Sequence, residues 1–174
     1  VIKSVGDMTS ALPATKPGTI AYLDGPHGNL TPSAPAVMKA TGLGLIAGGV
    51  GVAPLLSILR HLENTHDPRP VTLVYGNRSA EQIVYPQQLD QFAAQAGHRV
   101  VHVLREPPAD WPGPTPALPG VLSEALIRQV FEPCAIAGWT FLLCGPPAMV
   151  TTCTRALRGL GVSRDRILAE RFEY

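Results

Sequence analysis

The stretch LGLIAGGVGVAPLLSILRHL, residues 43–62, decides how this chain folds. Its opening apolar run predicts a buried strand, and apolar residues recur at helical spacing after the bend that follows. That bend contains Gly48, Gly49 and Gly51, and Pro54 follows it. Glycines let backbone N–H groups approach an anion closely, and a helix that begins there presents its positive end. The bend therefore has the character of a phosphate-binding turn, although Pro54 stands where the usual dinucleotide pattern has a third glycine.

Strand and helix patterns alternate through the rest of the chain. The predicted strands cover residues 43–47, 71–75, 99–104, 140–144 and 166–172. The predicted helices cover residues 53–62, 81–95, 122–130 and 147–160. Residues 105–120 hold so many prolines that we expect no regular structure there. Apolar strands alternating with helices indicate an α/β domain over residues 42–174, with a doubly wound five-stranded parallel sheet.

The first thirty residues do not follow this alternation. They read as strand, short helix, Pro-Gly turn and strand, and residues 19–25 resemble an antiparallel edge. So short a β unit cannot hold a core of its own. We expect residues 1–30 to be the last part of a preceding β domain and residues 31–41 to be a linker. The chain does not open with methionine, so we also expect it to come from a longer parent.

Composition argues against several classes of function. The 174 residues are 45% hydrophobic and 16% charged, with a net charge of +1 and basic residues scattered along the chain, so we expect no nucleic-acid partner. No apolar run approaches the roughly 20 residues that span a bilayer. The three cysteines and five histidines lack metal-ligand spacing, so we expect no metal site. The odd number of cysteines, Cys134, Cys144 and Cys153, favours a reducing, cytoplasmic setting.

Three further motifs complete the pattern around the glycine bend. They are YGNRSAEQIVYPQQLD at residues 75–90, FLLCGPPAM at residues 141–149 and ILAERFEY at residues 167–174. With the Gly-x-Gly-x-x-Pro of Gly49, Gly51 and Pro54, they resemble the NAD(P)H-binding domain of the ferredoxin–NADP reductase superfamily. The nearest resemblance is to its ferric reductase and NADPH oxidase branch. The resemblance implies the nucleotide-binding half of a ferredoxin reductase-like fold, preceded by the last part of a flavin-binding β-barrel.

The same resemblance implies where the cofactors would bind. The pyrophosphate of the nicotinamide nucleotide would rest on the glycine bend, where Val50 replaces the threonine of many relatives. The Gly-Pro-Pro after the fourth strand would line the path of the nucleotide, and the turn VGDMTS would meet FAD. The implied cofactor-binding residues are Gly6, Thr9, Gly48, Gly49, Val50, Gly51, Pro54, Asn77, Arg78, Arg105, Gly145, Pro146 and Pro147.

Charge near the adenosine ribose predicts NADPH over NADH. An NADH site usually places a carboxylate at the end of the second strand, and the sequence there is Gly76, Asn77, Arg78 and Ser79. Arg105 follows the third strand, and a guanidinium suits a phosphate through paired hydrogen bonds. Glu106 beside it could neutralise that charge, so NADH stays open.

Cys144, Glu170 and Phe172 are the residues that the resemblance implies nearest the chemistry. Cys144 would lie close to the nicotinamide carbon that gives up hydride, where it would pack against and orient the ring. Phe172 would stack on the flavin, with the Glu170 carboxylate close by. The plainer alternatives are a buried structural cysteine and a core aromatic residue on the last strand.

The activity implied is that of half a flavoenzyme. NADPH would give hydride to FAD, held mainly by the upstream barrel, and electrons would pass singly to haem, ferric iron or oxygen. The parent would then carry a haem-bearing transmembrane part, with this chain on its cytoplasmic side. Two alternatives stay open: an NADH-dependent reductase component of an oxygenase or cytochrome b5-type reductase, and a non-catalytic nucleotide-binding module.

Overall fold

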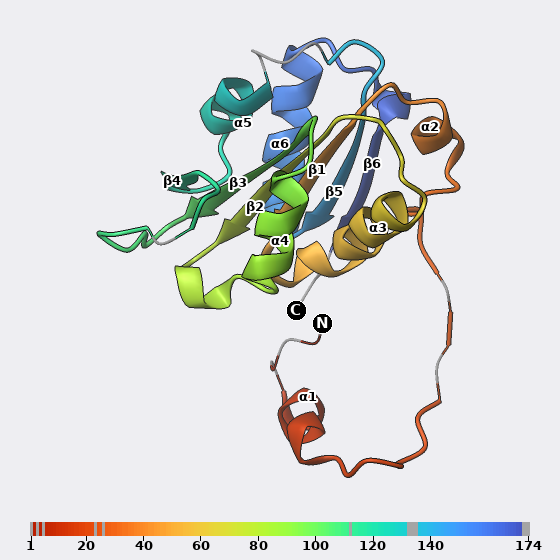
Figure 1. The fold of residues 1–174 in the computed structure, drawn as a ribbon, viewed down its shortest axis with the longest axis vertical. Coiled ribbons are helices and arrows are strands. Elements are labelled where there is room, and N and C mark those ends of the chain that lie inside the picture. Colours follow the sequence, from red (N-terminus) through yellow and green to blue (C-terminus); the bar gives the residue numbers. More distant parts are fainter. Residues whose placement is uncertain are drawn as a thin grey trace.

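A computed structural model describes residues 2, 4, 6–22, 24–25, 27–111, 113–131 and 136–171. Figure 1 shows a twisted sheet with helices on both faces, and an N-terminal segment that extends away from it. The strands are β1 (Leu43–Gly48), β2 (Val71–Asn77), β3 (His98–Leu104), β4 (Ala117–Pro119), β5 (Thr140–Gly145) and β6 (Ile167–Arg171). The α-helices are α1 (Asp7–Ala11), α2 (Pro35–Met38), α3 (Val52–Asn64), α4 (Pro86–Ala93), α5 (Glu124–Phe131) and α6 (Pro147–Gly159). Short 3-10 turns are η1 (Leu12–Ala14), η2 (Gly49–Gly51), η3 (Ala80–Gln82) and η4 (Arg164–Arg166).

The strands form one sheet in the order β4-β3-β2-β1-β5-β6, and every neighbouring pair is parallel. From β1 the chain winds outward through β2 and β3 in one direction and through β5 and β6 in the other. The winding therefore changes direction between β1 and β5. In sheets of this kind the crevice beyond the carboxyl ends at that point is where ligands bind. The doubly wound parallel sheet is confirmed, with six strands rather than the five expected.

Alternating side chains of the strands feed two cores, one on each face of the sheet. Leu45, Leu73 and Leu142 pack on the face covered by α2, α3 and α4. Ile46 and Val74 point the other way, toward α5 and α6. Because both faces are covered, the central strands are apolar throughout, as their sequence indicated.

The proline-rich stretch contains the strand that the sequence did not predict. In β4, Ala117–Pro119 pairs with β3 at the edge of the sheet. The His102 N–H donates to the Pro116 carbonyl oxygen at 2.9 Å, and the Gly120 N–H donates to the Leu104 carbonyl oxygen at 2.8 Å. An edge strand tolerates proline because one side of it needs no donor. The expectation of no regular structure was therefore wrong here.

The predicted helix over residues 81–95 is interrupted. Tyr85 lies in the left-handed region at φ +53°, and α4 begins only at Pro86. A residue before proline is disfavoured in the α-helical region, so the helix cannot run through Tyr85. The stretch forms η3, a short connection that ends at Tyr85, and then α4.

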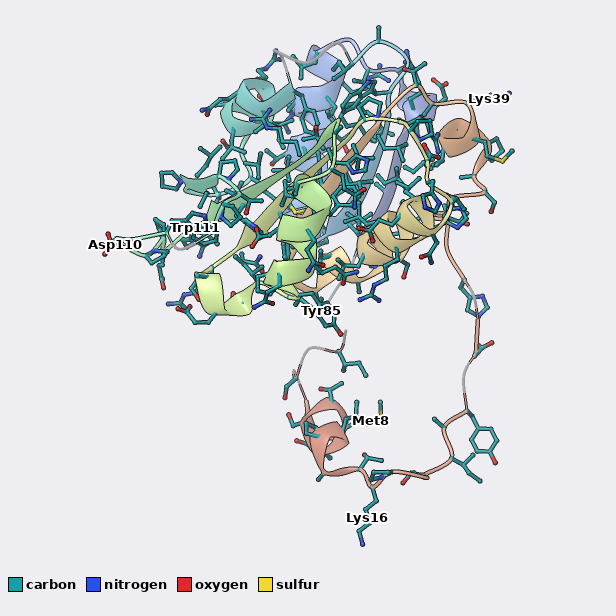
Figure 2. The ribbon with its side chains drawn as sticks, viewed as in Figure 1. Met8, Lys16, Lys39, Tyr85, Asp110 and Trp111 are labelled. Atoms are coloured by element: carbon teal, nitrogen blue, oxygen red, sulfur yellow. The ribbon has the colours of Figure 1, made fainter. Side chains whose placement is uncertain are left out.

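The N-terminal segment has no core within its described residues. Met8 and Lys16 lie on it far from the sheet, as Figure 2 shows, and Ile20 and Tyr22 are largely exposed. The strands expected within residues 1–30 are absent from the described part of that stretch.

The segment predicted as a linker, residues 31–41, packs on the sheet domain through α2. Val37 is fully buried, the Thr140 hydroxyl donates to the Ala36 carbonyl oxygen at 2.8 Å, and Arg69 donates to the Val37 carbonyl oxygen. Burial and hydrogen bonds therefore join this segment to the sheet domain.

None of the helices in the described residues is both long and apolar enough to cross a membrane. Within the same residues, histidine, cysteine and acidic side chains form no group of three able to hold a metal ion.

Candidate functional site

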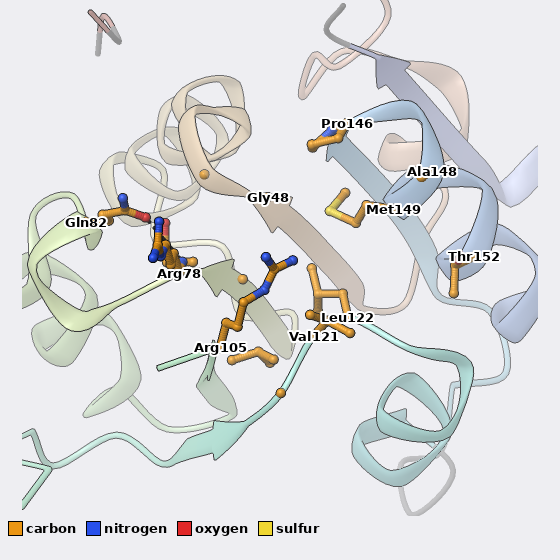
Figure 3. Close-up of a pocket in the computed structure, with 15 residues that line it drawn as sticks. Gly48, Arg78, Gln82, Arg105, Val121, Leu122, Pro146, Ala148, Met149 and Thr152 are labelled. Atoms are coloured by element: carbon orange, nitrogen blue, oxygen red, sulfur yellow. Dashed lines mark hydrogen bonds between the residues drawn. The ribbon is translucent and has the colours of Figure 1, made fainter. Parts of the chain in front are cut away.

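A cavity of about 590 Å³ lies beyond the carboxyl ends of the central strands, where the winding changes direction. Its lining includes six residues that the sequence predicted: Gly48, Gly49, Asn77, Arg78, Arg105 and Pro146. The sequence missed its other lining residues: Gly76, Gln82, Val103, Gly120, Val121, Leu122, Ala148, Met149 and Thr152. Figure 3 shows Arg105, Leu122 and Met149 around the same space. Position and size suit an elongated organic ligand.

Gly49 and Gly51, two of the three glycines of the β1–α3 bend, have different structural roles. Gly49 adopts φ +54° and borders the cavity, and an added Cβ there would meet nothing within 4 Å. Gly51 is buried, and an added Cβ would overlap the Cys144 carbonyl oxygen of β5. Gly51 therefore allows the start of α3 to touch the neighbouring strand. That is the packing role of the third glycine in the usual pattern, which Pro54 cannot fulfil.

The β5–α6 bend meets the β1–α3 bend through backbone atoms and also through the flexible Met149 side chain. An added Cβ at Gly48 would lie 2.6 Å from the Met149 sulfur, and one at Gly145 would lie 2.7 Å from the Met149 Cε. Pro147 opens α6, where its missing N–H costs no hydrogen bond. Met149 lies within the motif at residues 141–149, but its contact with both bends could not be predicted from the sequence.

Two arginines supply the charge of the cavity. The Arg78 Nε donates to the Glu106 Oε1 at 2.9 Å, and both side chains are more than half exposed. Arg105 points toward the middle of the cavity in Figure 3, and among the described residues its guanidinium forms no ion pair. No acidic residue lines the cavity in the described part of the chain. The arrangement favours an anionic ligand.

The Asn77 side chain has a buried amide without a hydrogen-bond partner among the described residues. Tyr75, two residues earlier, has a buried hydroxyl, and burial raises the pKa of that phenol. Asn77 lines the cavity at the end of β2, whereas Tyr75 does not.

Cys144 is fully buried at the end of β5 and does not line the cavity. Burial, reinforced by the negative charge of Glu170, raises the pKa of its thiol to about 12. The side chain packs in the core on the α3 face, beside Ala47 of β1. A protonated, buried thiol can pack and shape the site but cannot act as a nucleophile there.

The remaining predicted site residues lie outside the cavity lining. Val50 and Gly51 are in η2, Pro54 is in the first turn of α3, and Gly145 and Pro147 flank Pro146. Gly6 and Thr9 are on the exposed segment around α1, where the Gly6 N–H donates to the Thr9 hydroxyl at 3.1 Å. The Glu170 carboxylate accepts hydrogen bonds from residues 29 and 30. Phe172 is outside the described residues.

A doubly wound parallel sheet with a glycine bend, two arginines and an open cavity at its switch point defines a dinucleotide-binding domain. Residues 45–155 match the family model described as the oxidoreductase NAD-binding domain. The match covers more than half of the chain, which therefore belongs to this family.

Among curated proteins, the chain is similar to NADH-dependent reductases. The chain is 33% identical over 164 residues to NADH-cytochrome b5 reductase 1 of Candida albicans, covering 92% of this chain and 53% of the relative. It is 31% identical over 171 residues to a subunit of the Na(+)-translocating NADH-quinone reductase of Neisseria gonorrhoeae, covering 96% and 40%. The chain thus spans about half the length of the curated relatives that it matches.

Solved structures support the same fold. The cytochrome b5 reductase domain of Ulva prolifera nitrate reductase superposes with a TM-score of 0.79 at 20% identity, covering 95% of this chain and 64% of that domain. The fold is accordingly the nucleotide-binding half of a ferredoxin reductase-like protein, and the superfamily predicted from the motifs is confirmed.

Proposed function

We propose that this chain is the nicotinamide-nucleotide-binding half of a flavin-dependent reductase of the cytochrome b5 reductase type. Such a protein would take hydride from the nucleotide and pass electrons singly to a haem or iron–sulfur partner. The relatives support this alternative better than a ferric reductase or NADPH oxidase, because their names are those of cytochrome b5 and quinone reductases. The observation that carries the proposal is a cavity at the switch point, bordered by the open Gly49 bend and by two arginines.

The residues around the cavity fit a dinucleotide. An open glycine at φ +54° leaves the backbone of the bend accessible to a pyrophosphate, and α3 begins directly after it. Arg78 and Arg105 would meet the phosphate groups on the β2 and β3 side. Leu122 and Met149 offer apolar contact to a ring. When bound, the nucleotide supplies the hydride chemistry, and these residues bind it, orient it and keep water from its apolar parts.

NADH is the nucleotide that we propose first, because the names of both curated relatives carry NADH. One observation favours NADPH as a second candidate. The guanidinium of Arg105 has no acidic partner in the described chain and faces the cavity, so it could contact a 2′-phosphate. Glu106 instead engages Arg78, which lowers the positive charge at the end of β2.

The flavin would be held mainly by a barrel to which residues 1–30 belong. Gly6 and Thr9 lie on a segment whose described residues are nearly all exposed, so they can provide only part of such a site. We propose residues 42–174 as the nucleotide-binding domain proper, with α2 docked against it.

Calorimetry with NADH and NADPH tests the proposal, using Arg105→Ala and, as a matched control, Arg158→Ala on the exposed surface of α6. We expect NADH to bind, and Arg105→Ala to weaken both nucleotides by about threefold to tenfold, because a partly solvated guanidinium contributes modestly to anion binding. A loss of about tenfold or more confined to NADPH would assign Arg105 to the 2′-phosphate and NADPH to the protein. If neither NADH nor NADPH binds, the proposal is overturned.

A further inference from the structure

Glu170 joins two parts of the chain that are 140 residues apart. It lies on the edge strand β6, in register with Cys144 of β5. Its Oε1 accepts the Asn29 N–H at 2.7 Å and the Leu30 N–H at 3.2 Å. Hydrogen bonds to an ionised acceptor are the stronger ones in proteins. A single carboxylate oxygen therefore holds two consecutive backbone amides of the N-terminal segment against the sheet.

Gly28 shows how closely the two parts approach. Its backbone is left-handed at φ +103°, and an added Cβ would overlap the Glu170 Oε1 and lie 3.0 Å from the Glu170 Cδ. The position thus excludes a side chain for two reasons, one conformational and one steric. The carboxylate occupies the space that any other residue at 28 would need.

Within the described residues, the other features at this point are a cavity and one apolar contact. A second cavity, of about 480 Å³, is lined by Asn29 of the segment, Pro35 of α2, and Ile167 and Ala169 of β6. Leu30 is half-buried against the core on the α3 face. From residue 28 toward the N-terminus, the chain leaves the sheet domain and runs out toward α1, as Figure 1 shows. The Glu170 carboxylate is therefore at the exit point.

We propose that Glu170 is a positioning residue that fixes where the N-terminal segment leaves the sheet domain, beside the carboxyl end of β5. The carboxylate is not part of the cavity lining, and it accepts its two hydrogen bonds from the segment. Only the consequence for catalysis rests on the proposed function. If residues 1–30 belong to a flavin barrel, Glu170 sets the placement of that barrel relative to the nucleotide.

Hydrogen exchange at the two amides tests the contact directly, without any cofactor. In Glu170→Ala, we expect exchange at Asn29 and Leu30 to accelerate by about tenfold or more, since a charge-assisted acceptor is lost from both. Glu170→Gln keeps an acceptor oxygen and should restore most of the protection. The control is Glu124→Ala on α5, a half-exposed carboxylate paired with Arg155, which should leave both amides unchanged. Wild-type exchange at both amides in Glu170→Ala would overturn the proposal.

Gly28→Ala provides a second test in which the carboxylate is kept. The added methyl group must displace the Glu170 side chain, so exchange at Asn29 and Leu30 should again accelerate, by about threefold or more. Unchanged exchange in this variant would show that the segment and the carboxylate are not in contact.

A kinetic measurement on the flavin-loaded parent separates this inference from the proposed function. In Glu170→Ala the dissociation constant for NADH should stay within about twofold, because Glu170 does not line the nucleotide cavity. The rate of flavin reduction should fall by about tenfold, since hydride transfer depends steeply on geometry, and Glu170→Gln should recover it. A wild-type rate in Glu170→Ala would exclude the catalytic consequence. Failure of NADH to bind the unmodified protein would refute the proposed function and leave the exchange result intact.

Discussion

Two strand-to-helix bends lie side by side at the switch point, and they are built differently. At the β1–α3 bend, Gly51 touches the backbone of β5 and Gly49 is open to the cavity. At the β5–α6 bend, Gly145 and Pro146 are followed directly by the helix, and the space between the bends is filled by Met149. Backbone atoms within a sheet cannot move to make room for a new methyl group, whereas the end of a methionine side chain can. Contact between the bends is therefore tight at Gly51, where backbone meets backbone, and adjustable at Gly48, where the Met149 side chain lies between them.

Gly51→Ala should have the largest effect on stability. The new methyl group would overlap the Cys144 carbonyl oxygen, and neither backbone can move without disturbing the sheet. We expect a loss of about 3 kcal/mol in the free energy of unfolding, measured by urea denaturation. Gly49→Ala is the matched control. It meets no atom, so only its left-handed backbone conformation costs about 1 kcal/mol. Equal losses in the two variants would remove the contrast between a tight and an open glycine.

Gly48→Ala should have a smaller effect, because its new methyl group meets side-chain atoms, the Met149 sulfur at 2.6 Å and the Pro146 Cδ at 3.0 Å. Gly48 has an extended backbone, at φ −120° and ψ 115°, so no conformational strain is added. We expect a loss of about 1 kcal/mol. A double-mutant cycle with Met149→Ala should show a favourable coupling, since the shortened side chain makes room. Strict additivity would show that the bends do not meet through Met149.

The Cys144 thiol, at the end of β5, should make stability depend on pH only in alkaline solution. Its folded pKa of about 12 lies above the ordinary thiol value of 9.0. The unfolded chain therefore loses this proton first, and stability falls as the pH rises from 9 toward 12. The expected slope is about 1.4 kcal/mol per pH unit. Cys153 has the same folded pKa of about 12 and contributes equally.

Urea denaturation at several pH values, with Cys144→Ala beside the wild type, isolates this contribution. The variant should lose the part of the slope that belongs to Cys144, while any cavity it creates shifts stability by a constant amount at every pH. An unchanged slope would mean that the thiol titrates alike in both states.

The sequence predicted most of the elements that carry the site. The apolar runs at β1, β2, β3 and β5 fall where strands form, because strands covered on both faces must be apolar throughout. It missed β4 because proline is a strong signal against strands in general and a weak one at an edge. The helix predicted over residues 81–95 was wrong at Tyr85. Pro86 follows that residue, and a proline disfavours the helical conformation in the residue before it.

Of the candidate site, only residues at the ends of the strands were predicted from the sequence. Gly48, Gly49, Asn77, Arg78, Arg105 and Pro146 come from strand ends, and parallel strands bring such ends to one edge. Val121 and Leu122 enter the cavity from the loop after β4, and nothing in their local sequence indicated it. The contact between Glu170 and residues 29 and 30 depends on how the edge strand meets a distant segment.

By itself the sequence determined the α/β class, the position of the glycine bend and the superfamily, because hydrophobic period and glycine spacing act over a few residues. Only the tertiary structure decided which glycine is tight and which is open, which arginine is paired, and what Glu170 holds. Those outcomes depend on atoms that meet across the sheet from distant parts of the chain, and no local pattern encodes such a distance.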